Sequence, residues 1–249
     1  ASYRVIAALY SYLGDVDKSI GWTLRAQKLE PSNPSHTEKL AEYYADIGDF
    51  ETAMALDPEG IGILFKMRRY DEMIEFAEFA MLDQPNDMRI RSLLAIAHNA
   101  VGNYESAIHV LSDTGLPDSV LNGWRTIEEM DAYHALVNAL YGLGEIEMAR
   151  ELARWREDWG HTDSQDWWVN LRSACDHLIL DNENHARNLL KKAQQSLHLA
   201  WDPILRDSPC FRPVTDEPVY QATVRYFDER RVMLRERLPS TLAQFGVSL

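Results

Sequence analysis

The residues that could do chemistry in this chain are scattered and form no familiar catalytic motif. The sequence contains no GxSxG nucleophile elbow, no glycine-rich phosphate loop and no HExxH zinc motif. His177 and His185 are eight residues apart, but they fall on different sides of an expected turn at Asp181. Carboxylate pairs such as Glu128 and Glu129 are typical of solvated helix surfaces. We therefore expect a non-enzyme without a metal site or a cofactor.

Cysteines and tryptophans are the other residues with chemical potential. Cys175 and Cys210 form no CxxC pair, so we expect buried, reduced thiols, with a single bridge as the alternative. Four tryptophans lie around one expected loop, and we favour packing between helices over ligand binding for them: Trp155, Trp159, Trp167 and Trp168.

Composition and charge limit the classes of partner. The chain has 249 residues, of which 46% are hydrophobic and 26% charged, as in an ordinary globular protein. Its formal charge of −14 disfavours nucleic acid and anionic lipid and suits a neutral or basic protein partner. No apolar run approaches the roughly 18 residues that span a bilayer. The start, "ASYRVIAALY", lacks a Met and a basic signal head, so we expect a part of a longer protein.

A short motif recurs along the chain and sets its architecture. "LGDVDKSI", "IGDFETAM", "VGNYESAI" and "LGEIEMAR" share a glycine, a polar residue and a small residue at fixed spacing. Gly14 and Gly48 are 34 residues apart, and so are Arg68 and Gly102 if Arg68 stands in the glycine's place. Gly144 and Asp181 continue the series with longer spacings. Such a period indicates stacked helical hairpins.

Each unit has the chemistry of two helices joined by a tight turn. Glycine accepts the left-handed conformation that ends a helix, and the polar residue after it can cap the next helix. Small residues recur where the two helices must approach closely: Ala7, Ala41 and Ala95 before the turn, and Ser19, Ala53, Ala107, Ala149 and Ala186 after it. The sequence therefore predicts an all-α repeat array.

The pattern resembles the tetratricopeptide repeat (TPR), a 34-residue helix–turn–helix with small residues, an aromatic after the turn and a terminal proline. The resemblance covers residues 1–197 and implies about six repeats, one of them shortened near residues 50–68 into two short helices. It implies a right-handed superhelical solenoid with a C-terminal helical cap.

Residues 198–249 differ from the repeats. "WDPILRDSPCFRPVTDEP" is rich in proline and aspartate, so we expect short helical turns that cover the last repeat, followed by a final helix near residues 217–237. A capping role is favoured for this helix, with dimerisation as the alternative. This tail resembles the one that follows TPR arrays in bacterial multidomain signalling proteins and transcriptional regulators.

The TPR resemblance implies a concave groove, lined by the first helix of each unit, that takes a peptide or a partner helix. Helical spacing from each turn predicts the residues that line it: Arg89, Ser92, Asn99, His134, Asn138, Tyr141 and Trp168. Asn99 and Asn138 stand out because an amide both donates and accepts, and can hold the backbone of an extended peptide.

These patterns favour a protein–protein interaction or scaffold module, the sensor or regulatory part of a larger bacterial signalling protein. The alternative is a structural self-association module that forms a homodimer. We expect no nucleic acid to bind this region and no membrane insertion. A cytoplasmic location is the default expectation, and a periplasmic one follows if the chain belongs to a membrane-spanning regulator.

Overall fold

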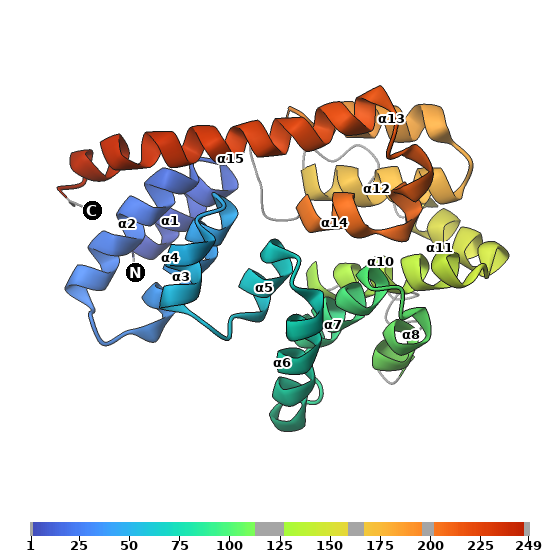
Figure 1. The fold of residues 1–249 in the computed structure, drawn as a ribbon, viewed down its shortest axis with the longest axis horizontal. Helices are drawn as coiled ribbons and strands as arrows, with labels where there is room; N and C mark the ends of the chain where they lie inside the picture. Colours follow the sequence, from blue (N-terminus) through green and yellow to red (C-terminus); the bar gives the residue numbers. More distant parts are fainter. Residues whose placement is uncertain (1, 113–126, 159–166, 196–201, 247–249) are drawn as a thin grey trace. The chain divides into compact units, whose positions relative to one another are not determined.

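The computed structural model describes the whole chain except residues 1, 113–126, 159–166, 196–201 and 247–249. The described residues contain helices and turns but no strand (Figure 1). The helices are α1 (Ser2–Tyr12), α2 (Val16–Leu29), α3 (Pro34–Asp46), α4 (Phe50–Leu56), α5 (Ile61–Met67), α6 (Tyr70–Asp83), α7 (Met88–Ala100), α8 (Tyr104–Ser112), α10 (Ile127–Leu143), α11 (Ile146–Asp158), α12 (Trp167–Ile179), α13 (Glu183–Ala193), α14 (Asp202–Asp207), the 3-10 helix η1 (Pro209–Val214) and α15 (Pro218–Gln244).

The turns of the repeats share one backbone geometry. In the α3–α4 turn the Gly48 amide donates to the Ala45 carbonyl, and the Asp49 amide donates to the Tyr44 carbonyl. This pair of bonds, a Schellman motif, recurs at the α1–α2, α7–α8, α10–α11 and α12–α13 turns. Gly14, Gly48, Gly102 and Gly144 all have φ between 75° and 84°. Sequence spacing thus located the hairpin turns correctly.

Two residues other than glycine occupy the same turn position. Arg68 has a φ of 60° and Asp181 a φ of 58°, the only positive-φ residues other than glycine among those described. The alignment that put them in the glycine's place is therefore confirmed. The stretch predicted to be a shortened repeat contains α4 and α5, which have seven residues each.

Gly102 offers a clean test of the turn geometry. It has a φ of 84°, and a Cβ built there would meet no atom within 4 Å, so only backbone strain opposes a side chain. We expect Gly102→Ala to lower the free energy of unfolding by roughly 1 kcal/mol, measured by urea denaturation. Gly62→Ala is the matched control: it also has open space, but it lies inside α5 and should be neutral or stabilising. An equal loss of unfolding free energy in both variants would show that the left-handed backbone at Gly102 is not the cause.

The chain divides into two compact units. Unit 1 contains residues 1–67, 194–202 and 224–249, and unit 2 contains residues 68–193 and 203–223. The final helix, α15, has residues in both units, since residues 218–223 belong to unit 2 and residues 224–244 to unit 1. It also extends to Gln244, beyond the predicted residue 237.

Unit 1 is held together by arginines on α15. Arg230 and Arg235 donate to the carbonyls of Gly14 and Gly48, at 3.0 Å each, where α1 and α3 end. Arg237 binds Asp17, whose side chain is fully buried and also accepts from Thr241 at 2.6 Å. Positive groups at helix C-termini are favourable because the helix dipole is negative there. In the described part of the chain, the apolar side of α15 is buried at Phe227, Leu234, Leu238 and Leu242.

Unit 2 contains the hairpins α7–α8, α10–α11 and α12–α13 together with the segment Pro203–Val214, which we call the tail segment. The small residues predicted at the helix contacts, such as Ala95, Ala107 and Ala149, are fully buried. η1 of the tail segment packs on α10 and α12, and α14 precedes it in the chain (Figure 1). The tail segment thus lies on the helices that were expected to line the groove.

Candidate functional site

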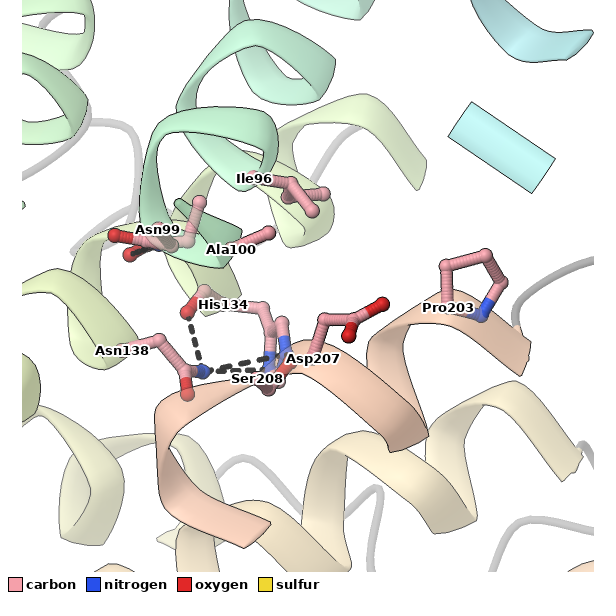
Figure 2. Close-up of a pocket in the computed structure, with 9 residues that line it drawn as sticks. Ile96, Asn99, Ala100, His134, Asn138, Pro203, Asp207 and Ser208 are labelled. Atoms are coloured by element: carbon pink, nitrogen blue, oxygen red, sulfur yellow. Dashed lines mark hydrogen bonds between the residues drawn. The ribbon is translucent and has the colours of Figure 1, made fainter. Parts of the chain in front are cut away.

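Three of the predicted groove residues meet the tail segment in a small pocket of unit 2. Asn99 on α7 and His134 and Asn138 on α10 line it together with Asp207 and Ser208 of the tail segment (Figure 2). The three groove side chains are at most 3% exposed. The pocket has a volume of about 10 Å³, room for one water-sized group and far too little for a small-molecule ligand.

The side chain of Asn138 contacts the backbone of the tail segment. Its Oδ1 atom accepts from the backbone amide of Cys210 at 3.4 Å, and its Nδ2 atom donates to the carbonyl of His134 at 2.9 Å. The Nε2 atom of His134 lies 3.4 Å from the Ser208 hydroxyl. The peptide held here is the protein's own tail segment, which occupies these groups in the structure.

Asn99 has a different role from the one predicted. Its Nδ2 atom donates to the carbonyl of Ala135 at 2.7 Å, which joins α7 to α10. Among the described residues its Oδ1 atom has no hydrogen-bond partner, although it is buried. Asn99 therefore joins α7 to α10, and within the described part of the chain it makes no hydrogen bond to the backbone of the tail segment.

The other predicted groove residues lie away from the tail segment's polar contacts. Arg89 is exposed, and the Ser92 hydroxyl is buried and donates to the Arg89 carbonyl at 3.0 Å within α7. Tyr141 is half-buried at the end of α10. Trp168 belongs to α12, but its side chain lies outside the described residues. Helical spacing thus placed Asn99, His134 and Asn138 in one site and not the whole set.

An ionic contact anchors the start of the tail segment. Arg68 donates to both carboxylate oxygens of Asp207, at 2.7 and 2.5 Å, and the Tyr70 hydroxyl donates to the same carboxylate at 2.5 Å. The bidentate pair raises the pKa of Arg68, and burial together with Asp207 raises the pKa of Tyr70. The sequence reading missed these residues because Arg68 was assigned only a turn position.

The tail segment buries several apolar side chains. Five of them are at most 5% exposed: Ile204, Leu205, Cys210, Phe211 and Val214. Burying a side chain of the size of Phe211 contributes about 2–3 kcal/mol relative to leaving it in water. We call the surface that receives the segment the tail-binding face, defined by Arg68, Tyr70, His134, Asn138 and Cys175.

A disulfide joins the tail segment to α12. Cys175 and Cys210 are bonded, with their Cα atoms 5.5 Å apart, and both side chains are fully buried. The expectation of two reduced thiols is therefore wrong, and the alternative of a single bridge is correct. The tail folds back so that Cys210 lies against α12. The two cysteines are 35 residues apart in the sequence, so their contact could not be predicted from local patterns.

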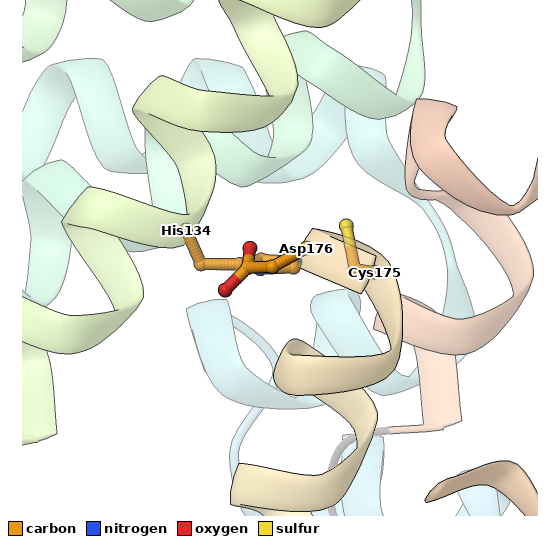
Figure 3. Close-up of side chains that lie close together, drawn as sticks. All are labelled: His134, Cys175 and Asp176. Carbon is orange, nitrogen blue, oxygen red and sulfur yellow. The ribbon is translucent and has the colours of Figure 1, made fainter. Parts of the chain in front are cut away.

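His134, Cys175 and Asp176 form the one cluster among the described residues with metal-ligand chemistry (Figure 3). Their ligand atoms lie within 4.8 Å of one another. However, Cys175 is held in the disulfide, and the Asp176 carboxylate is paired with the buried guanidinium of Arg156. A disulfide sulfur is not the thiolate that a metal requires, so these residues do not fit a metal in this state.

His177 on α12 and His185 on α13 lie on different sides of the turn at Asp181, as predicted. The turn folds α13 back against α12, so the two rings nevertheless meet, with centroids 4.0 Å apart and their planes tilted by 51°. The helices on either side of a hairpin turn face each other, which spacing along one helix does not show.

His134 should make unit 2 sensitive to acid. Burial and the nearby Arg156 lower its pKa to about 3, against about 6.5 when unfolded. The unfolded state therefore binds more protons below pH 6.5, and stability falls as the pH falls. We expect His134 to contribute a loss of about 2 kcal/mol between pH 7 and pH 5 in urea titrations. His134→Gln should reduce this loss of stability with falling pH, whereas a change at the exposed His109, His109→Gln, should not. If the wild-type protein and both variants lose the same stability between pH 7 and pH 5, His134 is not the group responsible.

No family model matches the sequence, and no curated protein matches it. Solved structures of MamA are similar in part. "MamA MSR-1 C2" is 15% identical, with 78% of this chain and 93% of that chain covered and a TM-score of 0.33. "MamA AMB-1 P212121" is 14% identical, with 78% and 89% covered and a TM-score of 0.32. These values are too low for anything about MamA's function to be transferred.

The architecture is identified from the backbone turns and helix contacts of this chain. Repeated Schellman turns, hairpins of adjacent helices and buried small residues at the helix contacts all occur together. The fold is an all-α array of TPR-like hairpins. None of the described helices is long and apolar enough to cross a membrane.

Proposed function

We propose that this chain is a protein-interaction module without catalytic activity of its own, the sensor or regulatory part of a larger bacterial signalling protein. Its working surface is the tail-binding face of unit 2, which binds a short peptide segment. One observation carries the proposal: this face already holds a peptide segment. Asn138 binds the segment's backbone at Cys210, and Arg68 binds the carboxylate of Asp207. Asn138 is the side chain expected to bind a peptide from its type and position.

The chemistry of the tail segment describes the partner. Asp207 supplies a carboxylate to Arg68 and Tyr70, and Phe211, four residues later, fills an apolar site. A partner segment with an acidic residue followed by an aromatic one at this spacing would make the same contacts. Recognition of this kind needs only a few buried anchors, because most interface contacts contribute little.

The experiment is a binding measurement with the tail segment removed from its own site. A fluorescent peptide of residues 203–214, with serine in place of Cys210, is titrated into the Cys210→Ser, Phe211→Ala variant, whose own tail segment is loosened. We expect saturable binding by anisotropy, weakened about tenfold or more by a further Asn138→Ala change. Arg89→Ala is the matched control, since Arg89 is exposed and apart from the tail segment's polar contacts. No binding to the folded variant would refute the proposed function.

Self-association remains the alternative function. Four apolar side chains of α15 are buried within unit 1 and are not free to form a helical dimer: Phe227, Leu234, Leu238 and Leu242. Val232 and Met233 are the exposed apolar side chains of this helix. Light scattering of the oxidised protein at several concentrations tests the alternative directly. A fixed doubled mass would favour a closed dimer over the peptide-binding module, whereas a monomer mass excludes it.

A further inference from the structure

The tail segment is attached to its binding face in two distinct ways. Reversible contacts come from the Asp207–Arg68 pair, from the Cys210 amide on Asn138 and from the buried apolar side chains. The disulfide between Cys175 and Cys210 is covalent and lies in the middle of the same surface. The disulfide therefore keeps Cys210 attached to α12 even when the reversible contacts break.

The covalent bond changes the competition between the tail segment and a partner. A tethered segment without a covalent bond acts as a competitor at an effective concentration of about 1 mM, which a tight partner can displace. With the bond intact, Cys210 cannot leave Cys175, so the central part of the face stays covered at any partner concentration. Whether these two sulfur atoms are bonded or reduced therefore decides whether a partner can replace the tail segment.

We propose that the Cys175–Cys210 disulfide is a lock that keeps the tail-binding face closed, and that its reduction by a dithiol opens the face to a partner segment of the tail's own chemistry. This inference rests on the proposed function and adds its regulation. The partner class is a peptide with a carboxylate at the place of Asp207 and an aromatic residue at the place of Phe211.

The exchange chemistry balances with a dithiol as the only co-reactant. One thiolate of the dithiol attacks Sγ of Cys210, forms a mixed disulfide and expels Cys175 as a thiolate. The second thiol attacks the mixed disulfide, releases Cys210 as a thiolate and leaves the dithiol oxidised to its own disulfide. Two electrons pass to the protein, and the two cysteines take up protons from water.

Neighbouring groups favour Cys175 as the leaving sulfur. The Nδ2 atom of Asn138 lies 3.3 Å from the Cys175 sulfur and can donate to a thiolate there. Cys175 is fixed within α12, while Cys210 belongs to the short helix η1, whose other residues can loosen while the bond is intact. Because both cysteines are fully buried, reduction must await this local loosening around the bond, so its rate reports the stability of the reversible contacts of the tail segment.

The test compares the wild-type protein before and after reduction with dithiothreitol, using the labelled 203–214 peptide with serine in place of Cys210. We expect reduction to tighten peptide binding at least about tenfold, with the helical circular dichroism unchanged. Cys175→Ser, which never forms the bond, should bind equally well with and without dithiothreitol. That variant controls for effects of the reductant on the peptide or on the fold.

Each contrary outcome is informative. Equal binding before and after reduction, with the Cys175→Ser variant binding tightly, would overturn the lock and leave the proposed function standing. Loss of helical signal on reduction would also overturn it, because the bond would then hold the fold and not the tail segment alone. Failure of the Cys210→Ser, Phe211→Ala variant to bind peptide would instead refute the proposed function itself.

Discussion

Replacing Arg172 by methionine should destabilise unit 2 by about 3–5 kcal/mol. Arg172 on α12 pairs with Asp131 on α10, and the two side chains are 1% and 5% exposed. Removing the guanidinium leaves a buried carboxylate without this cation, and a buried charge that loses its partner is strongly unfavourable. The measurement is urea unfolding followed by circular dichroism, with the disulfide kept oxidised.

Two further variants separate the buried pair from a general effect of lost arginines. The double change Asp131→Leu, Arg172→Met removes both charges and should recover most of the lost stability. Arg150→Met breaks an ion pair with Asp181, whose side chain is 75% exposed, and should cost less than about 1 kcal/mol. A small effect of Arg172→Met, similar to that of Arg150→Met, would show that the pair is not buried as described.

Phe211→Ala should loosen the tail segment by about 3–5 kcal/mol, the usual range for a fully buried phenylalanine. Phe211 is fully buried and contacts Tyr220, with ring centroids 6.1 Å apart. We expect the tail segment to open far more often in this variant, so that dithiothreitol reduces the disulfide at least about a hundredfold faster. The rate is measured by trapping free thiols and weighing the protein.

Arg212→Ala is the matched control for Phe211→Ala. Arg212 is the next residue, is exposed, and donates to the Tyr104 hydroxyl at 2.7 Å. Its loss should change stability by less than about 1 kcal/mol and leave the reduction rate nearly unchanged. Equal acceleration in both variants would mean that burial of the phenylalanine does not hold the tail segment closed.

The hairpins could be predicted from the sequence because their determinants are local. A left-handed residue, a helix-capping residue and a small residue at fixed spacing define each turn, and this pattern located even Arg68 and Asp181, which are not glycines. Long connections do not disturb this pattern, since each hairpin forms its own contacts. The fold class followed from these turns without any knowledge of how distant segments meet.

The candidate site could be predicted only in part because its other half comes from a distant segment. Helical spacing put Asn99, His134 and Asn138 on one surface, and they do line one pocket. It could not show that Cys210 and Asp207 return to that surface, since a turn-rich tail carries no periodicity. The partner for Arg68 was hidden for the same reason.

The central claim is that residues 203–214 lie bound on the tail-binding face of unit 2. Hydrogen exchange of the oxidised wild-type protein, resolved to the Cys210 amide and its neighbours, tests this most directly. The account predicts that exchange in η1 is slowed at least about a hundredfold relative to an unstructured peptide, and that Phe211→Ala removes most of this protection. Exchange in η1 at the rate of a free peptide in the oxidised wild-type protein would contradict it.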